Sequence, residues 1–167
     1  MAKRCITSGE SFGIVTLSAG NEVGADQAFA KVGTAATINT FDAPGPNQFV
    51  LDVIGEQRFE VISADIGRSG LHHAEVRWIT PEPQVKLRAE YSSLVTLLKP
   101  IVEQLGETRF VEPYEFEDAT WVGNRLAEIL QLPPTIKQAL LEINDAELRL
   151  KTLSQILSRS PKASQPS

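Results

Sequence analysis

The chain has 167 residues, of which 42% are hydrophobic, so it can form one domain with a proper core or two small packed subdomains. Its net charge of -5 disfavours a nucleic-acid partner, because phosphate backbones are bound by basic surfaces. No apolar run approaches the roughly 20 residues that cross a bilayer. The single cysteine, Cys5, cannot form an intramolecular disulfide. We therefore expect a protein of the reducing cytoplasm that has no membrane partner.

The first eighty residues show the short alternating apolar runs of an antiparallel sheet, separated by Gly, Pro and Asn. The segment 42–47 is rich in Pro and Gly and predicts a hairpin loop, while Gly55 predicts a break or a bulge. Pro81 and Pro83 end the β region. The predicted strands are residues 14–17, 32–41, 49–54, 58–63 and 74–79.

From Val85 the apolar period changes from two to about three and a half, which predicts helices. A stripe from Leu87 to Leu105 predicts a long helix that Pro100 kinks and Gly106 ends. Three further helices are delimited by an N-cap at Asp118, a restart at Pro133-Pro134, and a capping box formed by Asn144 with Glu147. We predict a β-rich domain over 1–82, a helical domain over 84–158 and a disordered tail over 159–167.

The sequence shows few residues in arrangements typical of catalysis. His72 and His73 are adjacent in a predicted strand, so they point to opposite faces and cannot both bind one metal ion. The chain has neither a G-x-x-x-x-G-K-[ST] phosphate loop nor a G-x-S-x-G nucleophile elbow. The acidic residues around Glu115 have no Cys or His neighbours and are typical of a solvated loop. We expect no catalysis, no metal and no cofactor.

Aromatic side chains are the stronger candidates for a binding role. Phe110, Tyr114 and Phe116 lie in a loop between charges, where they either pin the loop to the core or present an apolar surface to a peptide. Arg58 is an anion-site candidate, although it more readily pairs with a carboxylate on a neighbouring strand. The candidate peptide-binding residues are Arg58, Trp78, Phe110, Tyr114, Phe116 and Trp121.

Several strings resemble, in the same order, the N-terminal substrate-binding domain of the ATP-dependent protease Lon. In the β region they are G-E-S-F-G-I-V at 9–15, V-G-T-A-A-T-I at 32–38, the residues Leu51, Val53, Gly55, Arg58 and Phe59, and A-E-V-R-W at 74–78. In the helical region they are R-L-A-E-I-L-Q-L-P at 125–133, K-Q-A-L-L-E at 137–142 and D-A-E-L-R-L-K-T-L at 145–153. The resemblance covers residues 1–157.

This resemblance implies an α+β fold in which a PUA-like antiparallel β-barrel precedes a small helical bundle, as in the free-standing, single-module members found in bacteria. It implies a non-catalytic module that binds unfolded or specific protein substrates, as an adaptor or regulator of proteolysis. The family usually opens with a P-L-F-P-L strand that is missing here, so the sheet is expected to lack its first strand. An open edge of this kind favours a homodimer. The alternative is an RNA-binding module, since PUA-like barrels also occur in RNA-binding proteins.

Overall fold

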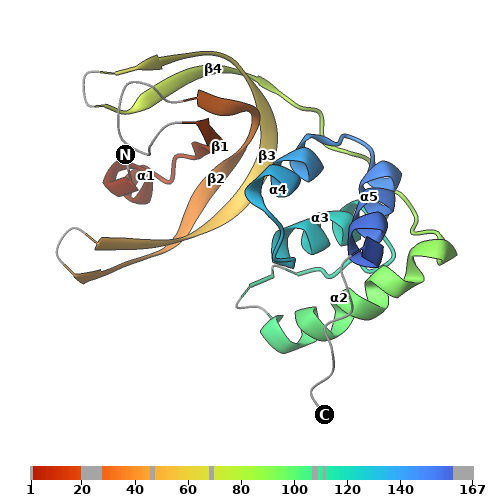
Figure 1. Cartoon of the computed structure of the whole chain (residues 1–167). Coiled ribbons are helices and arrows are strands. Elements are labelled where there is room, and N and C mark those ends of the chain that lie inside the picture. The colour runs from red at the N-terminus through yellow and green to blue at the C-terminus, as the bar shows by residue number, and fades with distance from the viewer. Residues whose placement is uncertain are drawn as a thin grey trace. The chain divides into compact units, whose positions relative to one another are not determined.

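The computed structural model describes residues 2–19, 28–45, 48–67, 70–106, 109–110 and 112–159, so the predicted tail lies outside the described residues apart from Arg159. The chain divides into two compact units, residues 1–81 and residues 82–167. The first unit contains the sheet and the second contains only helices and connecting segments (Figure 1).

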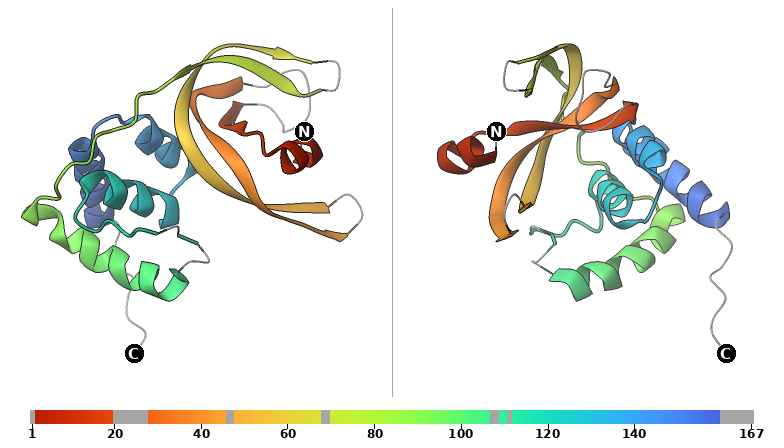
Figure 2. Two further views of the ribbon diagram at one scale, coloured as in Figure 1. Left: turned by 180° about the vertical axis from the view of Figure 1, so that it is seen from behind. Right: turned by 60° about the vertical axis from the view of Figure 1, so that its left-hand side comes forward.

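The β unit begins with helix α1 (Ala2–Ser8), which contacts strand β2. Its strands are β1 (Phe12–Ala19), β2 (Ala28–Gly45), β3 (Gln48–Ile66) and β4 (His72–Trp78). They form one antiparallel sheet in the order β1-β2-β3-β4, and the strands curve strongly (Figures 1 and 2). The predicted α+β class is confirmed, but β1 and β4 do not pair within the described residues, so the sheet is open and the expected barrel is not closed.

Two strand boundaries differ from the prediction because β2 and β3 continue to pair on both sides of irregularities in their register. The segment 42–47 was predicted as a loop, yet β2 continues to Gly45, which pairs with Gln48. An irregularity between Asp42 and Gly45 accommodates Pro44, which cannot donate to a ladder. The predicted strands 49–54 and 58–63 are parts of the single strand β3, and a register shift beside Gly55 supplies the bulge.

One row of paired residues across the sheet explains why β1 and β2 have glycine at Gly13 and Gly33. Gly33 on β2 pairs with Phe59 on β3, which pairs with Trp78 on β4. The ring of Phe59 lies over two glycines: a Cβ atom would come within 2.9 Å of it at Gly13 and within 2.7 Å at Gly33. The strings F-G, V-G-T, R-F and A-E-V-R-W therefore meet in one packing contact between four strands.

The helical unit contains a 3₁₀ turn (Ala89–Tyr91) and helices α2 (Ser92–Leu105), α3 (Ala119–Ile129), α4 (Pro134–Glu142) and α5 (Ala146–Arg159). Each helix turns an apolar stripe inward. The shared core is built from Leu94, Leu98, Val102, Phe110, Ala119, Val122, Leu126, Leu140, Ala146, Leu150 and Leu153.

The helix boundaries confirm some predictions and correct others. Asp118 caps α3, and Gly106, with φ 52°, ends α2. The long helix was predicted from Leu87, but α2 starts only at Ser92, after the 3₁₀ turn, and it continues through Pro100. The last helix is capped by Asp145 rather than by Asn144, because the Asp145 carboxylate accepts from the Leu148 amide at 2.8 Å.

A buried ion pair closes the helical unit. The side chains of Arg149 on α5 and Glu82 at the start of the unit are 1% and 5% exposed. Their two planar groups face each other, with Arg149 Nη1 3.0 Å from Glu82 Oε2 and a second contact from Nη2. The guanidinium also donates to the backbone carbonyls of Leu140 and Ile143. All three guanidinium nitrogens therefore have acceptors within the unit, which makes burial of the charge tolerable.

Candidate polypeptide-binding surfaces

The aromatic loop of the helical unit is pinned to its core. Phe110 is buried within the core cluster. Tyr114, Phe116 and Trp121 are partly buried and pack against that cluster and each other, with ring centroids 6.4 Å apart for Tyr114–Phe116, 6.3 Å for Tyr114–Trp121 and 5.2 Å for Phe116–Trp121. The structure therefore brings together four of the six predicted residues, and three of them keep part of their surface exposed.

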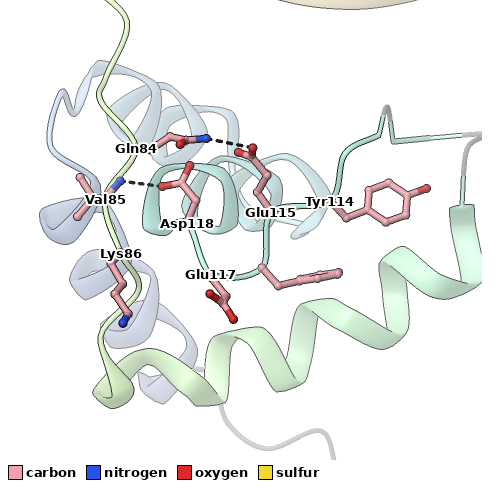
Figure 3. A pocket seen from close by; sticks show the side chains of 8 residues that line it. Gln84, Val85, Lys86, Tyr114, Glu115, Glu117 and Asp118 are labelled. Carbon is pink, nitrogen blue, oxygen red and sulfur yellow. Dashed lines mark hydrogen bonds between the residues drawn. The ribbon is translucent and has the colours of Figure 1, made fainter.

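A shallow groove lies beside this loop, where the extended segment 84–86 runs past residues 114–118 (Figure 3). The Val85 amide donates to the Asp118 carboxylate at 2.9 Å, and the Ala119 amide donates back to the Val85 carbonyl at 2.7 Å. Asp118 therefore caps α3 and also holds the neighbouring extended segment through Val85. The groove has a volume of about 470 Å³ and is lined by Gln84, Val85, Lys86, Tyr114, Glu115, Phe116, Glu117 and Asp118.

The chemistry of the groove is mixed. Tyr114 and Phe116 supply aromatic surface, while Glu115 and Glu117 supply carboxylates at the same opening. The Gln84 amide donates to Glu115 at 3.0 Å, as Figure 3 shows. Such a surface suits a side chain with an apolar body and a basic end, and contains no nucleophile with an adjacent base.

The other two predicted residues belong to the β unit. Arg58 is half-buried on β3 and pairs in register with Thr34, while its carbonyl accepts from the Ile79 amide at 3.0 Å. Trp78 is 55% exposed although its ring meets Phe59 edge to face, at 6.1 Å between centroids. Trp78 thus keeps a large apolar surface open to a ligand.

The sequence predictions missed a surface at the distal end of the β2–β3 hairpin. β1 pairs with β2 only as far as Ala36, and β4 pairs with β3 only from Phe59 onward. Residues 37–45 and 48–54, which we call the arm, therefore pair only with each other among the described residues, and Figure 1 shows them extending past β1 and β4. The arm exposes 52% of Phe49 and 58% of Val50.

The arm has two chemically different faces, because residues directly opposite on paired strands point to the same side. Phe41 pairs with Leu51, and its ring stacks on that of Phe49 with centroids 5.5 Å apart. On the opposite face Asp42 pairs with Val50, and alternation adds two more exposed residues of β3 to this face, Asp52 and Ile54. The apolar residues of 49–54 fall on both faces of the strand. This lack of alternation was the feature of the sequence that could have indicated a strand with apolar side chains exposed on both sides.

Other residues with reactive side chains have structural surroundings. His72 meets the ring of Phe29 at 4.8 Å, and His73 lies opposite Asp65 in the ladder. Lys137 donates from Nζ to the Glu128 carbonyl at 2.8 Å, at the end of α3. The part of the chain that the structure describes has no group of three His, Cys, Asp or Glu residues able to hold a metal ion, and none of its helices is long and apolar enough to cross a membrane.

Comparisons with known proteins agree with this architecture. A Lon N-terminal domain protein from Xanthomonas campestris is 30% identical, with a TM-score of 0.69 over 96% of this chain and 82% of that one. The N-terminal domain of a Mycobacterium avium complex Lon protease shares the fold at 17% identity, with a TM-score of 0.54 over 89% of this chain and 92% of that one. No curated protein matches the chain. The family model of the ATP-dependent protease La (Lon) substrate-binding domain matches residues 1–159, and the chain belongs to this family.

Proposed function

We propose that this chain binds protein substrates as a non-catalytic module and delivers or withholds them as an adaptor or regulator of proteolysis in the cytoplasm. The observation that carries the proposal is the match to a substrate-binding domain over residues 1–159. Two kinds of surface support it, each within one unit. The helical unit offers the groove with Tyr114 and Phe116, and the β unit offers Trp78 and the arm. Exposed apolar surface rimmed by polar groups is typical of protein interaction sites.

The first test is binding of an unfolded polypeptide. A fluorescently labelled, reduced and carboxymethylated α-lactalbumin should bind saturably in an anisotropy titration, whereas the same protein in its native, disulfide-bonded form should not. The native form is the matched control, because it has the same sequence but buries its apolar side chains. A flat titration up to high micromolar concentrations of this chain would contradict the proposal.

The second test separates an adaptor from a passive binder. A purified Lon-type protease should degrade the unfolded protein faster if this chain delivers substrate, and more slowly if the chain withholds it. A Trp78→Ser variant should weaken either effect, because Trp78 is the most exposed of the predicted binding residues. An Ile136→Ser variant is the control, since Ile136 on α4 is also an exposed apolar residue but is not one of the candidate binding residues. Unchanged degradation at saturating chain would argue against the adaptor and regulator roles.

The open sheet also supports the proposed homodimer. Within the described residues, the outer edge of β1 has no partner strand, so its backbone groups can pair with those of a second copy. Light scattering coupled to size exclusion should give a mass twice that of the 18.3 kDa chain, falling on dilution. A constant monomer mass at high concentration would overturn the dimer but leave substrate binding intact.

A further inference from the structure

The arm is an exposed two-stranded ribbon whose edges have no strand partner within the described residues. An isolated two-stranded hairpin is marginally stable in water, and unpaired strand edges readily accept another strand. In this arm the outer edge of β3 also carries the most exposed apolar side chains, Phe49 and Val50. Both features favour addition of an extended segment along β3.

The charges of the arm restrict what that segment can be. Residues 37–57 contain three acidic residues, Asp42, Asp52 and Glu56, and no Lys, Arg or His. Asp42 and Asp52 share the face of Val50, and both are exposed. A second copy of the arm would bring like charges together, so pairing of two arms is disfavoured. A partner with basic side chains on this face would instead be attracted.

We propose that the outer edge of β3 between Phe49 and Ile54 binds an extended polypeptide segment in which basic residues alternate with apolar ones. Strand addition places successive side chains of the segment on opposite faces. The basic residues then share a face with Asp52 on β3 and, one strand further away, with Asp42 on β2, while the apolar residues share the other face with Phe49 and the Phe41 ring that stacks on it. The inference rests on the proposed function and gives it a substrate class: cationic, apolar, extended segments.

The test uses a short dye-labelled peptide of alternating Lys and Val, with two matched controls. One control replaces each Lys by Glu, and the other keeps the sequence but methylates alternate backbone nitrogens, which removes the donors of a ladder. The Lys-Val peptide should bind saturably, the methylated peptide should not bind, and the Glu-Val peptide should bind at least about tenfold more weakly. Equal affinity for the Lys and Glu peptides would overturn the inference.

Variants of the arm locate the site. An Asp42→Asn, Asp52→Asn double variant keeps the oxygens that accept from the Ala43 amide and the Asn39 side chain. It should weaken binding of the Lys-Val peptide about three- to tenfold at low salt, and the difference should shrink at high salt. A Glu90→Gln, Glu103→Gln double variant removes the same net charge from exposed positions of the helical unit and should bind like wild type. Equal losses in both double variants would show that only net charge matters, and would overturn the site.

The outcomes also separate this inference from the proposed function. If unfolded α-lactalbumin binds while the peptides are not distinguished and the arm variants behave like wild type, substrate binding stands and the arm site is wrong. If the Lys-Val peptide binds in an arm-dependent way while unfolded α-lactalbumin does not, the arm site stands and general binding of unfolded proteins is wrong. Equal unfolding midpoints for the arm variants and wild type exclude loss of folding as the cause.

Discussion

Arg149 shows how much of the helical unit depends on one side chain. It is charged and fully buried, and it joins α5 to Glu82 and to the backbone carbonyls of Leu140 and Ile143. Sequence periodicity did predict the last helix, but it could not predict that an arginine faces inward. The reason is that its carboxylate partner lies 67 residues earlier in the chain. The sequence also predicted Asn144 instead of Asp145 as the cap of this helix, because the two adjacent residues are equally suitable caps.

Replacing Arg149 by Met should lower the free energy of unfolding of the helical unit by about 3–5 kcal/mol, because the Glu82 carboxylate is left buried without a cation. Urea unfolding followed by far-UV circular dichroism measures the loss. Arg77→Met is the matched control: Arg77 also pairs with a carboxylate, Glu60, but its side chain is exposed, so we expect a loss below about 1 kcal/mol. Similar losses in the two variants would show that burial of the pair is not what matters.

At the scale of elements, the apolar periods predicted most helices and strands because local sequence decides them. The sheet and four of the helices were anticipated, including the cap at Asp118 and the stop at Gly106. What local sequence could not decide was where bulges prolong a strand, so β2 and β3 run through Pro44 and past Gly55. It also could not show that β2 and β3 outreach their neighbours, because that follows from the lengths of β1 and β4.

The packing of Phe59 predicts a sharp difference between two glycines of the sheet. In a Gly33→Ala variant the new Cβ atom would lie 2.5 Å from the Ile14 carbonyl oxygen and 2.7 Å from the Phe59 ring, so the strands must separate. Overpacking of this kind costs about 1–3 kcal/mol or more. Gly55→Ala is the control, since its new Cβ would meet only the Thr34 methyl at 3.5 Å. Thermal unfolding should show a lower midpoint for Gly33→Ala alone, and equal midpoints would refute the role of the ring.

At the scale of the whole molecule, the order of elements and the α+β class followed from sequence, while the extent of the sheet did not. The resemblance implied a barrel that lacks its first strand, and the described strands form an open sheet in which β1 and β4 do not pair. Of the candidate surfaces, the sequence pointed to the aromatic loop but not to the arm. Aromatic composition led to Tyr114, Phe116 and Trp121, whereas the arm was missed because its importance depends on which neighbouring strands stop short.

The division of the chain predicts that the helical unit folds alone, since its core cluster is drawn entirely from residues 94–153. A fragment of residues 82–159 should be helical and unfold cooperatively in urea. A fragment of residues 84–159 lacks Glu82, so Arg149 loses its carboxylate and the fragment should be less stable by about 3 kcal/mol. Equal stability of the two fragments would show that the pair does not close the unit.

The chain order of these contacts has a consequence for synthesis on the ribosome. Every strand of the sheet pairs with the strand next to it in sequence, so all of the described ladders can form once Trp78 has left the exit tunnel. The helical unit can complete its fold only later, because Glu82 emerges 67 residues before Arg149, with which it pairs. During that interval a nascent chain carries a formed sheet followed by helices without their last partner, and the apolar stripes of α2 and α3 are what chaperones would meet.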